Sequence, residues 1–256
     1  MSISDSPYRH VLITGASRGI GAALATRLAA PGVRLSLTAR SVDALSQVKR
    51  TCEGRGAVVE VEAMDVSDTE RLRHWLRHCD AALPLDCVIA NAGVAATVKK
   101  SQMESQSEMD RILGVNACAA LITAHEAAAL MVSRKSGQVV LMGSVGGWAG
   151  MPVSAAYNAT KAAVRVYAHG LRGQVARKGV KVTVVMPGFV ETDMSAAYPG
   201  PKPWLVSADV AADRIVKALQ RNPAEISFPW PLATAMRFLS ILPADWALWL
   251  QRKFGY

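Results

Sequence analysis

Short apolar runs recur along this chain, and longer stretches with helical spacing separate them. The runs VLIT at 11–14, CVIA at 87–90 and VVLM at 139–142 are almost free of polar residues, as expected of strands buried on both faces. Extended segments are predicted at 10–14, 33–39, 57–63, 86–90, 138–143, 181–186 and 225–228. Because strands alternate with helices, the pattern predicts an α/β fold in which helices cover both faces of a doubly wound, mostly parallel seven-stranded sheet.

One domain with a C-terminal extension accounts for this pattern. Residues 1–228 form the predicted domain. Within it, the Gly- and Pro-bearing stretch at 187–206 is too long for an ordinary connection and predicts a lid. Residues 229–256 continue past the last strand as two short hydrophobic helices that are broken at Pro243.

Composition narrows the class of protein. The 256 residues are 51% hydrophobic and 19% charged, which excludes disorder and allows one large core. The net charge is +9, but Lys and Arg are spread along the chain, so we expect no nucleic-acid partner. No uninterrupted apolar run is long enough to predict a membrane-spanning helix, and the first ten residues lack the features of a signal peptide.

The cysteines indicate the compartment. They have no C-x-x-C spacing and fall within apolar segments, at Cys52, Cys79, Cys87 and Cys118. We therefore expect four buried thiols, no metal site and a cytoplasmic location.

A glycine-rich turn follows the first strand. In TGASRGIG at 14–21, Gly15 permits a tight turn, Gly19 leaves room for phosphate groups, and Gly21 lets helix and strand pack closely. The free N–H groups at the start of the next helix favour a pyrophosphate there. The spacing predicts a Rossmann-type dinucleotide site, although a purely structural turn would use the same residues.

The residue at the end of the second predicted strand indicates which dinucleotide is bound. A site for NAD usually has an acidic residue there, whereas this chain has Arg40, followed by Ser41. Arg40 and Arg18 would both pair with the 2′-phosphate of NADP. We expect NADP(H) to be preferred over NAD(H); the alternative is that both arginines are surface residues of a basic protein.

Tyr157 and Lys161 are four residues apart in a predicted helix and therefore share one face. Making a tyrosine anion accessible at about pH 7 costs about 4 kcal/mol, because the free phenol titrates at about pH 10. One positive charge about 4 Å away contributes a similar amount at an effective dielectric constant of about 20. Ser144 follows a predicted strand, so its hydroxyl can donate to a substrate oxygen at the carboxyl edge of the sheet.

These motifs and their order resemble the short-chain dehydrogenase/reductase family over about residues 8–228. The resemblance rests on TGASRGIG at 14–21, Asp65-Val66, Asn91-Ala92-Gly93, Asn116, Ser144, Tyr157 with Lys161, and Pro187-Gly188. It implies hydride transfer between a nicotinamide cofactor and a carbonyl or alcohol. It also implies a catalytic tetrad of Asn116, Ser144, Tyr157 and Lys161. Asn is a poor residue in a run of alanines, so Asn116 independently predicts a local kink or a bound water.

The resemblance further implies that Asp65 contacts the adenine and that Thr192 helps to hold the nicotinamide end. The implied cofactor-binding residues are Gly15, Ser17, Arg18, Gly19, Ile20, Gly21, Arg40, Ser41, Asp65, Val66, Asn91, Ala92, Gly93, Tyr157, Lys161, Pro187, Gly188, Val190 and Thr192.

The segments expected around the substrate are apolar, which favours a lipid-like, steroid-like or long-chain carbonyl or alcohol. The candidate substrate residues are Trp148, Met151, Phe189, Met194 and Trp204. The alternative is that these side chains only pack the lid shut and do not contact a substrate. A 3-oxoacyl thioester on an acyl carrier protein is a second substrate hypothesis, and a non-catalytic nucleotide-binding regulator is a hypothesis of another class.

The C-terminal extension combines aromatic and basic residues. Trp246, Trp249, Leu250 and Lys253 have the i, i+3, i+4, i+7 spacing of one helical face. Such a face fits either a packing or dimer element or a peripheral contact with a membrane. The family resemblance implies a homodimer or homotetramer.

Overall fold

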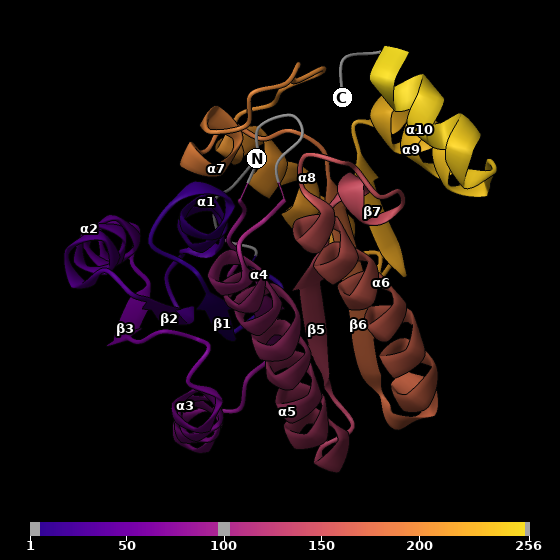
Figure 1. Cartoon of the computed structure of the whole chain (residues 1–256). Helices are drawn as coiled ribbons and strands as arrows, with labels where there is room; N and C mark the ends of the chain where they lie inside the picture. Colours follow the sequence, from indigo (N-terminus) through magenta and orange to yellow (C-terminus); the bar gives the residue numbers. More distant parts are fainter. Residues whose placement is uncertain (1–5, 97–102, 254–256) are drawn as a thin grey trace.

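The computed structural model describes residues 6–96 and 103–253 (Figure 1). The ends of the predicted domain and of its extension, at 1–5 and 254–256, lie outside the described residues.

One seven-stranded sheet forms the centre of the molecule. Its strands are β1 (His10–Thr14), β2 (Arg34–Ala39), β3 (Val58–Ala63), β4 (Cys87–Ala90), β5 (Gly137–Met142), β6 (Val180–Pro187) and β7 (Glu225–Phe228). The strand order is β3-β2-β1-β4-β5-β6-β7, and each pairing between these strands is parallel. The predicted fold class is therefore confirmed. The chain reverses its direction of winding between β1 and β4, and the crevice at their carboxyl ends is where such sheets bind ligands.

Helices cover both faces of the sheet. The first five are α1 (Gly19–Leu28), α2 (Val42–Glu53), α3 (Thr69–Ala82), α4 (Gln106–Ile112) and α5 (Ala120–Ser133). The others are α6 (Ala155–Val175), α7 (Asp193–Ala196), α8 (Ala208–Leu219), α9 (Trp230–Ile241) and α10 (Ala244–Lys253). Buried side chains of α1, α2 and α8 form one core cluster with the sheet, and those of α3, α5 and α6 form a second. The strands are apolar on both sides because each side has its own core.

The chain after β6 leaves the sheet and returns to it. It contains the short helix α7, and Val190 and Val206 near its two ends form an isolated parallel bridge. After β7, α9 and α10 lie next to each other in the upper right of Figure 1, away from β3 and α2. Val145, Leu232 and Met236 form a small core cluster between α9 and the chain after β5.

A helical stretch without a long polar interruption runs from α4 to α5. By length and composition, Gln106–Ser133 is the one helix among the described residues that is apolar enough to cross a membrane. Half of its most apolar window is buried inside the fold, where α5 contacts α3, α6 and β5. A helix in the core of a folded domain has the same length and apolar composition, so these two properties are weak evidence for a membrane span.

Three of the four cysteines are buried, as predicted, and the prediction for Cys118 is wrong. Burial raises the pKa of Cys52 to about 11 and that of Cys79 to about 12. Cys118 is exposed. The reason is its spacing from the buried Asn116, because residues two apart in a helix point to different sides.

Candidate active site

The glycine turn after β1 lies against the end of β4. Gly15 and Gly19 have φ angles of +68° and +55°, which favour glycine. A Cβ atom on Gly21 would lie 2.3 Å from the carbonyl oxygen of Gly15 and 2.5 Å from Nδ2 of Asn91. Arg18, which precedes α1, makes no side-chain cap, so the first N–H groups of α1 are available to a ligand. These residues therefore fit a dinucleotide pyrophosphate, as the sequence predicts.

Asn91 ties the two strands at the crevice together. Its Nδ2 donates to the carbonyl oxygens of Thr14 and Gly15, both at 3.0 Å. In return, Oγ1 of Thr14 accepts from the backbone N–H groups of Asn91 at 3.0 Å and Ala92 at 3.1 Å. This network holds the glycine turn in place before any ligand binds.

Asp65 and Arg40 lie close enough to interact at the end predicted to take the adenosine. Oδ1 of Asp65 accepts from the backbone N–H of Ser67 at 2.9 Å and from its hydroxyl at 2.7 Å. These hydrogen bonds, with a smaller effect from the Arg40 charge, lower the pKa of Asp65. Ser41 uses its hydroxyl to cap α2, and Val66 is buried. Arg40 is exposed and available to an anionic group.

Arg18 has a partner that the sequence analysis did not identify. Its guanidinium donates to Asp193 of α7 at 2.7 Å, so an exposed ion pair joins the glycine turn to the chain after β6. Thr192 caps α7, and its methyl carbon would lie 2.9 Å from a Cβ on Gly19. The segment that contains Val190 and Thr192 therefore adjoins the glycine turn.

The remaining predicted cofactor residues lie around the same crevice or support it. Ser17 is partly exposed in the turn, and Ile20 packs against the core. Pro187 ends β6, and the backbone N–H of Gly188 donates to the carbonyl oxygen of Phe228 at 2.7 Å. The glycine turn, Asn91 and Gly188 thus lie at the ends of β1, β4 and β6.

Asn116 lies in a π-helical turn, Leu113–Ala119, between α4 and α5. The predicted kink is therefore present, in the form that often marks functional positions in helices. Its side chain donates to the carbonyl oxygen of Val94 and accepts from the Val94 N–H, both at 2.8 Å. It also donates to Oγ1 of Thr160 at 3.3 Å. Asn116 thereby connects the chain after β4 to α6.

Lys161 lies inside the site, with 4% of its surface exposed. Its ammonium donates to the carbonyl oxygen of Met142 at 2.8 Å and lies 5.6 Å from the centre of the Tyr157 ring. A Cβ on Gly93 would lie 3.6 Å from the Lys161 Nζ and 3.5 Å from Oδ1 of Asn116. Burial lowers the pKa of Lys161 to about 8.

The hydroxyl of Ser144 lies close enough to the Tyr157 phenol to affect its pKa. Burial raises the pKa of Tyr157, and the interaction with the Ser144 hydroxyl partly opposes that rise. The prediction that Lys161 brings the phenol pKa below its ordinary value is therefore wrong for this structure, because the loss of water around the phenol outweighs the favourable interactions. The geometry nevertheless brings the four predicted tetrad residues to one place.

The turn after Ser144 is pressed against α6. Oγ of Ser144 accepts from the N–H of Gly146 at 3.1 Å, and residues Val145–Gly147 form a 3₁₀ turn. A Cβ on Gly147 would lie 2.7 Å from the carbonyl carbon of Lys161. Only glycine allows this approach, so the turn fixes Ser144 relative to the helix that carries Tyr157.

Trp148 follows this turn, and two arginines lie close to its indole. The guanidinium carbons of Arg237 and Arg165 lie 4.6 Å and 5.7 Å from the centre of a Trp148 ring. Glu225 at the start of β7 accepts from Arg165 Nε at 2.8 Å, pairs with Arg237, and accepts from the Ser227 hydroxyl at 3.0 Å. One carboxylate thus holds both cations against the indole.

This clamp of Arg165, Glu225 and Arg237 is not among the residues predicted from the sequence. The sequence signals one member of it, because Arg165 lies four residues after Lys161 and shares its helical face. The contributions of β7 and α9 arise only from tertiary structure.

The five predicted substrate residues are not all brought together. Trp148, Met151 and Phe189 pack around the small cluster that contains Val145 and Met236. Phe189 also lies 5.3 Å from Tyr198, measured between ring centres. Met194 and Trp204 are exposed and far less constrained.

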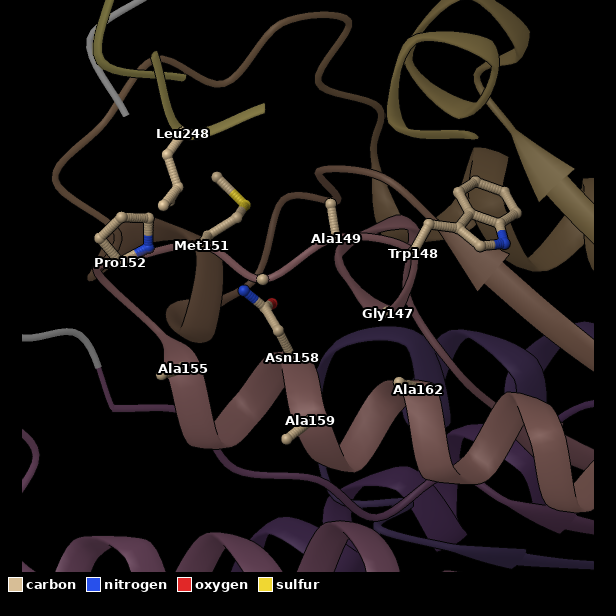
Figure 2. A pocket seen from close by; sticks show the side chains of 11 residues that line it. Gly147, Trp148, Ala149, Met151, Pro152, Ala155, Asn158, Ala159, Ala162 and Leu248 are labelled. Atoms are coloured by element: carbon tan, nitrogen blue, oxygen red, sulfur yellow. The ribbon is translucent and has the colours of Figure 1, made fainter. Parts of the chain in front are cut away.

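A hollow of about 390 Å³ lies between the chain at 147–152, α6 and α10. Figure 2 shows Met151, Asn158 and Leu248 directed into it, while the indole of Trp148 points away. Trp148 therefore contributes to the wall mainly with its backbone, because its ring is held by the arginines. Phe189, Met194 and Trp204 do not line this hollow.

The burial of Lys161 predicts a pH-dependent stability. An unfolded lysine keeps its proton up to about pH 10.5, whereas the folded one releases it above about pH 8. Below pH 8 the folded state therefore bears the full cost of a buried charge. We expect Lys161→Met to be more stable than the wild type at neutral pH, and this difference to shrink by up to about 1.4 kcal/mol per pH unit as the pH rises from 8 to 10.5. Urea unfolding across this range measures the effect.

The control is Lys217→Met, at an exposed ion pair. Its stability relative to the wild type should show no such trend with pH.

The clamp predicts a loss of stability in Glu225→Gln. Burial raises the pKa of Glu225, but the hydrogen bonds from both arginines and Ser227 outweigh it and hold the pKa below 4.5. A depressed carboxylate pKa stabilises the fold above the unfolded value, and that stabilisation disappears as the pH falls through the folded value. We expect a loss of about 2 kcal/mol at pH 7 that shrinks below about pH 4.5. Glu53→Gln, at the exposed pair with Lys49, should change stability by less than about 0.5 kcal/mol. Equal losses in both variants would contradict this account.

Comparisons with known proteins show which family the chain belongs to. The short chain dehydrogenase family model matches residues 9–201. An uncharacterized oxidoreductase from Myxococcus xanthus is 34% identical over 242 residues, which cover 94% of this chain and 95% of the relative.

Solved structures give the same result. A short-chain dehydrogenase from Sphingobium yanoikuyae in complex with NADPH is 27% identical, with a TM-score of 0.79, and the match covers 91% of this chain and 96% of that one. The bulky-bulky ketone specific alcohol dehydrogenase from Comamonas testosteroni is 26% identical, with a TM-score of 0.78 and coverages of 93% and 96%. The resemblance read from the motifs is confirmed: this chain belongs to the short-chain dehydrogenase/reductase family and is an NAD(P)-dependent oxidoreductase of that family.

Proposed function

We propose that this protein is an NADPH-dependent reductase that interconverts a carbonyl and an alcohol on an apolar substrate. The observation that carries this proposal is that the Ser144 hydroxyl and the Tyr157 phenol lie next to each other beside the buried ammonium of Lys161. The pair lies at the carboxyl edge of the sheet, on the same side as the glycine turn.

The chemistry follows from the donors at this site. The bound nicotinamide cofactor supplies the hydride that reaches the carbonyl carbon. Oγ of Ser144 accepts from the Gly146 N–H, and its hydroxyl hydrogen can donate to the carbonyl oxygen of a bound substrate. Tyr157 transfers its phenolic proton to the same oxygen as negative charge develops there. Lys161 keeps a positive charge near the phenol, and Asn116 positions α6 through Thr160.

Two arginines support the preference for NADPH. Arg40 is exposed at the end of β2, near Asp65, and the residue at this position is a cation that would attract a 2′-phosphate, not an acid that would repel it. Arg18 lies in the glycine turn and would exchange Asp193 for that phosphate. The related Sphingobium enzyme was solved with NADPH.

Apolar side chains support the substrate class. Val145, Met151, Phe189 and Met236 gather next to the turn that carries Ser144. The related Comamonas enzyme is described as specific for bulky ketones. A 3-oxoacyl thioester is the second candidate, favoured by the net charge of +9, which would attract an acidic carrier protein.

The role of Tyr157 gives the first test. Tyr157→Phe removes the proton donor but leaves the glycine turn intact, so turnover of ketones should fall by at least about a hundredfold. The affinity for NADPH, measured by its fluorescence on binding, should stay within about threefold. Tyr167→Phe, at another tyrosine of the same helix, should keep full activity. Retained turnover in Tyr157→Phe would overturn the mechanism, and a preference for 3-oxoacyl thioesters over ketones would favour the second candidate.

The cofactor preference has its own test. Arg40→Gln removes a charge-assisted hydrogen bond to the 2′-phosphate, so kcat/KM for NADPH should fall by about tenfold to a hundredfold. The value for NADH should not change, because NADH has no phosphate there. Arg50→Gln, at an exposed position of α2, the helix that follows Arg40, should alter neither value. An equal loss with both cofactors in Arg40→Gln would contradict the proposed preference.

A further inference from the structure

Helix α10 has two sides of different character. Its inner side buries Ala247 and Gln251. Its outer side carries Trp246 and Trp249, which are 67% and 59% exposed, in the spacing that the sequence predicts for one helical face. Trp246, Trp249 and Leu250 also line a hollow of about 400 Å³ on this side. Exposed indoles gathered in this way mark an interaction surface.

Helix α9, joined to α10 through Leu242 and Pro243, adds further apolar surface. Trp230 and Ile241 are each 77% exposed, and Phe238 is 55% exposed.

Cations accompany the tryptophans on α10. Arg252 and Lys253 are exposed at its end, and Nζ of Lys253 lies 5.1 Å from the centre of the Trp249 ring. Residues 229–253 contain a single acidic residue, Asp245. Tryptophan prefers the level of the lipid headgroups, and lysine and arginine beside it pair with anionic headgroups. A second copy of this chain would instead present cations to cations, which opposes association.

The inner side of α10 reaches the chain that follows Ser144. Gln251 donates to the carbonyl oxygen of Gly150 at 3.1 Å, and Leu248 lines the hollow that also contains Met151 (Figure 2). Nδ2 of Asn158 is buried in the wall of that hollow and has no hydrogen-bond partner among the described residues. The hollow is thus lined mainly by apolar groups and contains one amide donor without a partner among the described residues. Such a site suits an apolar molecule that carries an oxygen acceptor.

We propose that the outer side of α10, with the exposed side chains of α9, binds the surface of an anionic lipid membrane, and that apolar substrate passes from the lipid along α10 to the site. The enzyme then acts as a cytoplasmic protein held peripherally on a membrane. Binding to lipid stands on the α9 and α10 observations alone, whereas the passage of substrate rests on the proposed function.

Flotation of the full chain with vesicles tests the binding step. We expect the protein to float with vesicles of phosphatidylcholine and phosphatidylglycerol, and less with phosphatidylcholine alone. Trp246→Ala with Trp249→Ala should weaken binding by at least about tenfold, because both indoles lose their place at the headgroups. Arg252→Gln and Lys253→Gln should each weaken binding by about fivefold on the anionic vesicles only, and added salt should reduce the difference.

Matched controls lie on α2, at the opposite side of the molecule (Figure 1). Val42→Ala removes an exposed apolar side chain, and Lys49→Gln removes an exposed cation. Neither should change flotation. Circular dichroism of each variant checks that it is folded.

Several outcomes would overturn the inference. The first is failure of the intact chain to float, and the second is unchanged flotation after loss of both indoles. The third is a fall in oligomeric mass in the double variant without any lipid binding. That third result would make this side an interface between copies of the chain. Activity on short, water-soluble ketones without vesicles reports on the proposed function separately. A chain that reduces them but does not float would overturn the membrane binding alone, and one that floats but reduces no ketone would overturn the proposed function.

Discussion

The buried ammonium of Lys161 sets the requirements that the surrounding elements meet. A charge in this position needs a partner, and the carbonyl oxygen of Met142 at the end of β5 provides one at 2.8 Å. The same contact fixes α6 against the sheet, and with it Tyr157 one turn earlier. Gly93 has no side chain and leaves the space beside the ammonium open. The side-chain amide of Asn116 is hydrogen-bonded to the backbone of Val94. The site can therefore keep a lysine of lowered pKa without losing its geometry.

Close backbone contacts carry the rest of the arrangement. A Cβ atom on Gly21 would overlap the carbonyl oxygen of Gly15, and a Cβ atom on Gly147 would overlap the backbone of Lys161. The first contact keeps the N–H groups of α1 open to a phosphate, and the second keeps Ser144 beside Tyr157. Both contacts are possible only because glycine has no Cβ atom, so these two glycines determine the geometry of the site.

The C-terminal helices connect this centre to the surface. Arg237 of α9 stacks on Trp148, and Gln251 of α10 holds Gly150, so both helices touch the chain that follows Ser144. Their outer sides expose tryptophans. A partner that binds those outer sides would consequently contact the same two helices that pack against the chain after Ser144.

The resemblance to the family supplied the predicted tetrad of Asn116, Ser144, Tyr157 and Lys161. The sequence by itself determined the α/β fold, the parallel sheet, the glycine turn and the shared face of Tyr157 and Lys161, because each depends on local periodicity or on spacing within one element. Tyr157 and Lys161, for example, share a face in any helix. Tertiary structure alone decided which distant groups meet: Arg18 with Asp193, and Glu225 with both arginines around Trp148. It also decided that Cys118 is exposed and that burial raises the pKa of Tyr157. Burial and long-range pairing depend on how whole elements pack, and no local pattern records that.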